Sequence, residues 1–321
     1  HGANRFKPIY YDRIKAGIQF ARTEYEIVRE GPTTMVVDGH DGMGMVVAKQ
    51  AMQTAIDKAR RYGMGMVVVR NSTHYGIAGY YATMASSQGM IGITGTNARP
   101  SIAPTFGVEN MLGTNPLTVG MPTDEDFPFV LDCATSTVQR GKIEYYARIG
   151  KPTPAGMVID QEGNIRTDSE GILVDLTKGT AALTPLGGAG EEMAGYKGYG
   201  YATVVEILSA ALQQGSFLKM LTGIKDGKKV PYGLGHFFIA IDVAAFCEPA
   251  DFRKTTGDIL RELRASRKAP GQDRIYTAGE KEHEAWLFRQ EKGVPFNSGV
   301  MKEFIEVRDA LGLTAHHFPF E

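Results

Sequence analysis

The 321-residue sequence lacks the features that mark membrane proteins and nucleic-acid-binding proteins. No apolar run approaches the roughly 20 residues that cross a bilayer. The apolar helix expected at residues 201–212 is too short and contains Glu206. An excess of one charge is also lacking, since 35 basic and 36 acidic side chains leave a formal net charge of −1. We therefore expect neither nucleic acid nor a membrane surface as the main partner.

Cysteine is scarce as well. The only two, Cys133 and Cys247, are far apart in the sequence, which excludes a disulfide framework and favours a reducing, cytoplasmic setting. No Cys/His cluster has the spacing of a zinc site, so we expect no metal. Cys133 lacks a nearby charged activator in the sequence, so we do not expect a catalytic thiol. No signal peptide is visible.

The common nucleotide-binding signatures are missing. The sequence has neither a Walker A motif nor the Gly-rich Rossmann fingerprint after a first strand. It does have a glycine cluster at 187–190 and a second at 195–200, where Lys197 stands at the start of a predicted helix. Lysine and backbone N–H groups at such a place suit a phosphate. A dinucleotide enzyme with this sequence would need a fold other than Rossmann.

What is present is an alternation of helical and strand patterns, which is typical of an α/β protein. Residues 150–196 are rich in Gly, Pro and Thr and are predicted to be surface loops. After Pro249 three helices are expected, near 249–267, 280–292 and 298–311, packed with the N-terminal helix away from the sheet. The other expected helices span residues 1–18, 45–62, 77–88, 136–149 and 199–214, and the expected strands span 35–37, 64–69, 90–95, 117–121, 129–131 and 236–242.

Polar residues with chemical potential lie at two places near the start of the chain. His1 and Arg5 share a face if this segment is helical. Arginine can hold a carboxylate through two parallel hydrogen bonds, and histidine titrates near neutrality. His74 lies in a loop between a strand and a helix, and Ser72 or Thr73 is expected to cap that helix. The plainer alternatives are a frayed terminal helix and an incidental histidine.

Later loops offer further candidates. Thr114 and Asn115 precede a strand and can present a hydroxyl and an amide to a polar ligand, although a simple turn explains them equally well. The segment 131–136 is a strand end followed by small residues, a place where a phosphate-bearing ligand can approach the backbone. His316 and His317 are interpreted as a surface pair.

In combination these motifs are more specific than any one of them. His1-Gly2 with Arg5 and Tyr10 resembles the H-G-x-x-R signature of the malate/L-lactate dehydrogenase-like oxidoreductases. That family also includes sulfolactate, ureidoglycolate and diketogulonate enzymes and reductases of cyclic imino acids. The resemblance covers essentially the whole chain. It continues in order through Asp38-Gly39 with Gly42 and Gly44, the His74 loop, 113–116, 132–135, 195–198 and Gly279-Glu280.

The resemblance implies an α/β fold with a mixed, largely antiparallel, non-Rossmann sheet domain that binds NAD or NADP. A helical domain built from both chain ends accompanies it. We place the helical domain at 1–32 plus 249–321 and the sheet-bearing domain at 33–248. Family members are typically homodimers, and their partner is a small 2-oxo or 2-hydroxy acid.

The resemblance also assigns residues. His1, Arg5 and His74 match catalytic positions: His1 as proton donor or acceptor, Arg5 as the carboxylate clamp, and His74 in an acid/base or substrate role. Substrate-region positions are Arg5, His74, Tyr75, Thr114 and Asn115. Cofactor-contacting positions are Thr96, Asn97, Asp132, Cys133, Ala134, Thr135, Lys197, Gly279, Glu280 and Lys281.

We therefore expect hydride transfer between NAD(P)H and a 2-oxo acid, with malate/oxaloacetate as the first substrate and lactate, sulfolactate or ureidoglycolate as alternatives. Lys142 stands where imino-acid reductases of the family tend to carry Asp, which argues against that activity. A non-catalytic cofactor-binding protein is the alternative from another class, and the intact set of His1, Arg5 and His74 argues against it.

Overall fold

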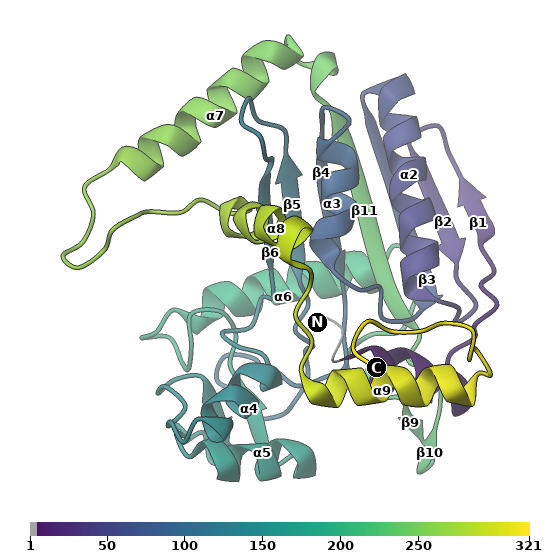
Figure 1. Cartoon of the computed structure of the whole chain (residues 1–321), viewed down its shortest axis with the longest axis vertical. Helices are drawn as coiled ribbons and strands as arrows, with labels where there is room; N and C mark the ends of the chain where they lie inside the picture. The colour runs from purple at the N-terminus through teal and green to yellow at the C-terminus, as the bar shows by residue number, and fades with distance from the viewer. Residues whose placement is uncertain (1–4) are drawn as a thin grey trace.

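A seven-stranded sheet forms the centre of the molecule (Figure 1), whose computed structural model describes residues 5–321. The strand order is β1-β2-β3-β11-β4-β5-β6. β2 and β3 are parallel, and the other five neighbouring pairs are antiparallel. The predicted mixed, largely antiparallel sheet is confirmed. Its strands are β1 (Glu26–Glu30), β2 (Thr34–Asp38), β3 (Met64–Ser72), β4 (Met90–Thr96), β5 (Leu117–Met121), β6 (Phe129–Cys133) and β11 (Leu234–Asp242).

Helices cover both faces of this sheet. α2 (Gly44–Tyr62) and α3 (Ala78–Ser86) lie on one face, and α6 (Gly195–Ala210) lies on the other (Figure 1). Because side chains alternate along a strand, Phe238 of β11 joins the core under α2, whereas its neighbour Phe237 packs with Val205 of α6. Both phenylalanines are fully buried, so β11 anchors two hydrophobic layers at once.

The helix predicted over 45–62 matches α2 closely. It ends at Gly63, whose φ of 84° is the left-handed conformation that favours glycine at this position. Its apolar stripe, which includes Ala48, Met52 and Ala59, is completely buried. This continuous packing explains why the sequence pattern predicted the helix so well.

The prediction of loops over 150–196 is wrong for part of that stretch. It contains β7 (Val158–Asp160), β8 (Ala181–Leu183) and α5 (Ser169–Lys178). Asp168 caps α5 by accepting from the N–H of Gly171 at 3.1 Å, and Gly179 ends the helix with a φ of 78°. These elements share a core with α4 (Arg140–Arg148), and the remaining short elements are β9 (Ile224–Lys225), β10 (Lys228–Lys229), η3 (Leu218–Thr222) and η4 (Val243–Ala245).

The two chain ends meet, as expected, through one C-terminal helix. A π-helical turn, η2 (Lys7–Tyr11), continues into α1 (Asp12–Lys15), so the described part of the N-terminal helix is shorter than predicted. α9 (Ser298–Ala310) packs on this segment, and the rings of Phe6 and Phe304 lie 5.7 Å apart.

The other two C-terminal helices do not lie away from the sheet, which differs from the expectation. Arg261 of α7 (Pro249–Ala265) forms an ion pair with Asp124 in the β5–β6 turn at 3.0 Å. The segment before α8 (Glu280–Lys292) accepts a hydrogen bond at Ala278 O from Val130 N of β6. The division into two domains at 32/33 and 248/249 stays a prediction. No helix within residues 5–321 has the length and apolar character to span a membrane.

Candidate active site

The loop that carries His74 is fixed to the start of α2. The Oγ1 of Thr73 accepts a hydrogen bond from Gly44 N at 3.0 Å and donates one to Gly42 O at 2.7 Å. A Cβ on Gly44 would lie only 2.2 Å from the Thr73 carbonyl oxygen, so this approach requires glycine. The glycines of the sequence motif therefore hold the histidine loop in place.

The prediction that Ser72 or Thr73 caps the following helix is wrong. Thr73 binds α2 instead, and no side chain of the preceding loop caps α3. The N-terminus of α3 receives Asp132 from the end of β6, whose Oδ2 accepts from Gly79 N at 2.7 Å. A carboxylate at this position is favoured because it meets unpaired N–H groups and the positive end of the helix dipole.

A buried polar cluster around His236 packs against the histidine loop. His236 of β11 contacts Thr96 Oγ1 through Nδ1 at 2.7 Å and Ser72 Oγ through Nε2 at 2.8 Å. The ring of Tyr75 stacks on His236 with centroids 4.6 Å apart. Burial lowers the pKa of His236 to about 3, so it is neutral. The sequence analysis missed His236, although a lone histidine in an apolar strand was a signal.

His74 is a neutral imidazole with a defined tautomer. Its Nδ1 accepts a hydrogen bond from Gly76 N at 3.2 Å and lies 2.8 Å from the Tyr10 hydroxyl. Because Nδ1 is an acceptor, the ring proton is assigned to Nε2. Burial, together with the positive charges of Arg13 and Arg5, lowers the pKa of His74 to about 4. The imidazole can thus donate a hydrogen bond from Nε2.

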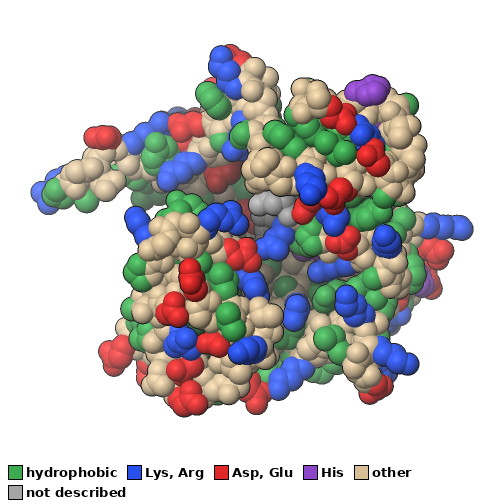
Figure 2. Space-filling view, turned by 60° about the horizontal axis from the view of Figure 1, so that its bottom comes forward, with side chains coloured by type: hydrophobic (Ala, Val, Ile, Leu, Met, Phe, Trp, Pro, Cys, Tyr) green, Lys and Arg blue, Asp and Glu red, His purple; other side chains and the backbone are tan. Residues whose placement is uncertain are grey.

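A cavity of about 580 Å³ opens beside His74 and is strongly basic. Five arginines and one glutamate are among the described residues that line it, and Figure 2 shows Lys and Arg side chains around a hollow in this face of the molecule. Arg5 and Thr114 also line it, so three predicted site residues meet here. His1 lies outside the described residues. The cavity arginines are Arg5, Arg13, Arg99, Arg140 and Arg148, and the glutamate is Glu144.

A smaller cavity of about 200 Å³ adjoins the first. The two share His74 and Thr114 in their linings. The smaller one extends from there over the end of β4 and the end of β6. The residues predicted to contact a cofactor that line it are Thr96, Asn97, Asp132 and Ala134, and Tyr75 lines it too.

The walls of both cavities depend on buried Glu206 of α6. Its Oε2 accepts from Asn115 Nδ2 at 2.7 Å, and its Oε1 accepts from Leu218 N at 2.8 Å. Asn115 Oδ1 in turn accepts from Ala98 N at 3.2 Å. The side chain of Asn115 is fully buried, so it shapes the cavity from behind. Sequence reasoning missed Glu206 because its partners are distant in sequence.

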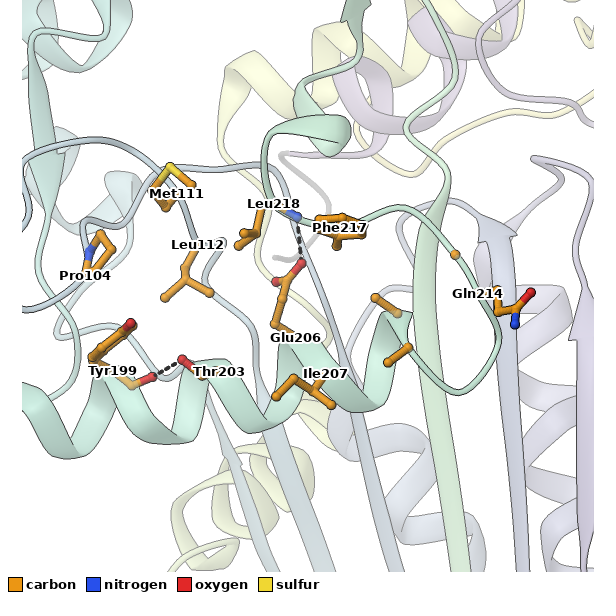
Figure 3. Close-up of a pocket in the computed structure, with 13 residues that line it drawn as sticks. Pro104, Met111, Leu112, Tyr199, Thr203, Glu206, Ile207, Gln214, Phe217 and Leu218 are labelled. Atoms are coloured by element: carbon orange, nitrogen blue, oxygen red, sulfur yellow. Dashed lines mark hydrogen bonds between the residues drawn. The ribbon is translucent and has the colours of Figure 1, made fainter.

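Glu206 also borders a separate cavity of about 450 Å³, which is mostly apolar (Figure 3). Leu112, Ile207 and Phe217 are among its lining residues, and the backbone N–H of Leu218 bonds to Glu206 at its edge (Figure 3). This cavity contains none of the predicted site residues. It is therefore distinct from the two cavities that meet at His74.

The sequence matches the malate/L-lactate dehydrogenase family over residues 1–305. The chain belongs to this family. It is 42% identical to the malate dehydrogenase of Pyrococcus horikoshii over 98% of this chain and 84% of that protein. It is 35% identical to the L-sulfolactate dehydrogenase of Methanocaldococcus jannaschii over 99% of this chain and 87% of that protein. The malate dehydrogenase structure from Entamoeba histolytica has a TM-score of 0.93 and 45% identity, covering 99% of this chain and 87% of that one.

As a member of this family the protein is an oxidoreductase that acts on 2-hydroxy acids, and its two adjoining cavities meet at His74. Two predicted residues near the dehydrogenase's smaller cavity do not line it. Cys133 is half-buried, and burial raises the pKa of its thiol. Thr135 is buried and donates to Asn115 O at 2.9 Å, so it holds the turn that carries Thr114.

The remaining predicted cofactor residues of the dehydrogenase lie outside both linings. Lys197 is in the first turn of α6, and the neighbouring Gly198 is needed because a Cβ there would lie 2.2 Å from Leu186 O. Glu280 is buried in ion pairs with Arg274 and, at 3.6 Å, with Arg264. The segment 279–281 follows Ala278, whose carbonyl oxygen accepts a hydrogen bond from Val130 N of β6. Val130 precedes Asp132 by two residues, so the segment begins near the end of β6.

Proposed function

We propose that the protein catalyses the reversible reduction of oxaloacetate to malate with NADH, with NADPH as the alternative reductant. The observation that carries this proposal is the basic cavity beside the neutral His74, joined to a second, smaller cavity. A basic cavity favours an anionic 2-oxo acid. The names of the relatives from Pyrococcus and Entamoeba support malate as the substrate.

The residues of the smaller cavity fit a nicotinamide. Thr96 and Ala134 are small, which leaves room for a flat ring, and the cavity ends at His74, where substrate would meet it. When bound, the reduced nicotinamide supplies the hydride for the carbonyl carbon. We propose that Asp132 binds beside it and that Lys197, Gly279 and Lys281 hold more distant parts of the cofactor. Glu280 fixes the 279–281 segment through its ion pairs.

Arg5 is proposed to hold the carboxylate next to the reacting carbon. Its guanidinium lines the basic cavity and makes a long ion pair of 3.6 Å with Glu144. A contact of that length on a half-exposed side chain contributes little, so the fork of N–H donors can turn to a substrate carboxylate. The positive charge of Arg5 also helps to lower the pKa of His74.

We propose that His74 orients and polarises the carbonyl oxygen, and that His1 transfers the proton. A neutral imidazole that carries its proton on Nε2 is a good hydrogen-bond donor. It is a poor acid, because loss of that proton would leave an imidazolate. His74 therefore stabilises the developing alkoxide by donation from Nε2. The proton that completes the hydroxyl must come from another group, and His1 is our candidate.

We further propose a homodimer in the cytoplasm. The outer face of α6 carries Tyr201, Val204 and Ile207, each about half exposed, which is unusual for large apolar side chains on one helix face. A second copy that packs on this face would bury them. Both cysteines are free, which suits a reducing compartment.

The test is a panel of 2-oxo acids with NADH and NADPH, followed by loss of nicotinamide absorbance. We expect the highest kcat/KM with oxaloacetate. An enzyme that reduces pyruvate or another 2-oxo acid more efficiently than oxaloacetate would contradict the malate proposal. No turnover of any 2-oxo acid with either cofactor would contradict the proposed reaction as a whole.

A further inference from the structure

We infer that Arg13 and Arg99 form a second anion-binding subsite, which selects substrates that carry an anionic group on the carbon next to the reacting carbonyl. This inference rests on the proposed function, since it concerns the same basic cavity. In this arrangement different arginines bind the two anionic ends of the substrate. Arg5 holds the carboxylate beside the carbonyl, and the Arg13–Arg99 pair holds the distal group.

The five arginines of the cavity are not equivalent. Arg5 and Arg140 share the carboxylate of Glu144, at 3.6 and 3.1 Å. Neither Arg13 nor Arg99 has an ion-pair partner within residues 5–321. Arg148 has no such partner either, so the cavity contains three guanidinium groups whose charge no described carboxylate balances. Of these, Arg13 stacks on Tyr232 and interacts with the charge of Arg99, whereas Arg148 stands at the end of α4.

Arg13 is built into the cavity wall. It is half-buried on α1, and its guanidinium carbon lies 4.3 Å from the centroid of the Tyr232 ring. Such cation–π stacking holds the planar group in one orientation without using its hydrogen-bond donors. The N–H groups of Arg13 are thus left free for an anion.

Arg99 lies close enough to Arg13 for the two charges to act on each other. Burial lowers the pKa of Arg13, and the positive charge of Arg99 lowers it further. Two like charges beside one cavity repel, and an anion between them relieves that repulsion. Arg99 follows the Thr96–Ala98 segment that lines the smaller cavity, so it stands near the reacting centre.

His74 connects this pair to the chemistry. The charges of both Arg13 and Arg5 help to lower its pKa, so both arginines lie near the imidazole. A substrate whose carbonyl oxygen meets His74 can then offer one anionic group to each arginine. Oxaloacetate meets this requirement with a carboxylate, and 3-sulfopyruvate meets it with a sulfonate. Pyruvate lacks the second anion.

The experiment compares Arg99→Gln with Arg148→Gln. Arg148 is a matched control, because it is also an exposed arginine that lines the same cavity but stands at the end of α4. Steady-state kcat/KM is measured for oxaloacetate, 3-sulfopyruvate and pyruvate. In Arg99→Gln we expect kcat/KM to fall about 10- to 100-fold for the two dianions, the effect of one charge-assisted hydrogen bond. For pyruvate we expect a change below about 3-fold, and Arg99→Lys should restore part of the loss.

A fall of equal size for pyruvate, or an equal fall in Arg148→Gln, would overturn the inference while leaving the proposed reaction intact. A loss confined to oxaloacetate assigns the subsite to carboxylates, and a loss confined to 3-sulfopyruvate assigns it to sulfonates. If the wild type reduces none of these acids, the proposed function fails. The subsite is then tested by comparing the rise in Tm of the protein with succinate and with propionate. The inference requires a larger rise in Tm with succinate than with propionate, and loss of this difference in Arg99→Gln.

Discussion

At the scale of single residues, the chemistry of the site depends on the protonation of His74. Its environment opposes a positive charge because the ring is buried and two guanidinium groups lie near it. With a pKa of about 4, the imidazole stays neutral across the physiological range. A neutral donor beside a carbonyl stabilises charge as it develops, with little reorganisation.

His74→Ala should therefore lower kcat for oxaloacetate reduction by about 10² to 10³-fold, the effect of removing one preorganised donor. The rate of the wild type should show no ionisation of His74 between about pH 5 and 8, since the pKa lies below that range. Stopped-flow or steady-state rates at several pH values measure both. His40→Ala, which removes an exposed histidine paired with Glu26, is the control and should leave kcat unchanged.

A different pH profile would contradict this role. If kcat of the wild type depended on a group with a pKa near 6.5 and that dependence vanished in His74→Ala, His74 would be the proton donor. The division of work between His74 and His1 would then be reversed.

The location of a candidate residue could be predicted from sequence where the signal was local, while its role in the site stays a prediction. His74 lies directly after a strand, and Thr114 lies in a turn before one, so both could be placed near a cavity from pattern. Glu206 and His236 could not, because their partners are remote. Glu206 binds Asn115, 91 residues away, and His236 binds Ser72, 164 residues away. A single sequence contains no record of such pairs.

At the scale of elements, the same distinction holds. α2 was predictable because its buried stripe repeats at helical spacing and Gly63 ends it. α5 was not, since only Ser169 and Ile172 are buried in it and the flanking segments are rich in turn residues. The Asp168 cap and Gly179 were local signals that went unused. The strand β1 is exposed throughout, so it has no alternation to detect.

The attachment of α7 and α8 leads to a prediction about Glu280. Its buried carboxylate is ion-paired with Arg264 and Arg274 and accepts from Thr277 N at 3.0 Å, an arrangement like a helix capping box. Glu280→Gln should therefore destabilise the fold by about 1–3 kcal/mol, since it leaves a guanidinium poorly paired. Thermal unfolding should show a lower Tm, with KM for the cofactor changed little at temperatures where the protein is folded.

Lys281→Gln is the matched control for Glu280. Its side chain is exposed, with the ammonium 4.6 Å from the Tyr276 ring centroid, and we propose that it contacts the cofactor. We expect a raised cofactor KM and an unchanged Tm. If the two variants showed the opposite pattern, Glu280 would be the cofactor contact and Lys281 a structural residue.

At the scale of the whole molecule, the two buried histidines make stability depend on pH. In the unfolded chain histidine binds a proton near pH 6.5. In the folded protein His74 does so near 4 and His236 near 3. Between these pH values the unfolded state binds more protons than the folded state. The contribution of the two histidines to the free energy of unfolding is therefore fully present above pH 6.5 and is lost as the pH falls toward 4.

His236→Gln tests this linkage. An amide can keep contacts with Ser72 and Thr96 but does not titrate in this range. The variant should show a smaller fall of Tm between pH 6.5 and 4 than the wild type, even if its Tm at neutral pH is lower. His40→Gln, at an exposed site, should follow the wild-type curve. An unchanged slope in His236→Gln would show that other groups cause the acid sensitivity.

The assembly of two chains is the last property at this scale. α6 packs one face on the sheet and exposes Tyr201, Val204 and Ile207 on the other, so an isolated chain leaves a helix that is apolar on both sides. If a second copy covers this face, a charge there would be buried without a partner and would oppose association.

Val204→Glu should therefore shift the protein from dimer to monomer in sedimentation velocity at micromolar concentration. Val174→Glu introduces the same change at an equally exposed valine of α5 and should leave the dimer intact. A monomeric wild type would exclude the dimer, and a dimeric Val204→Glu would move the interface to another face.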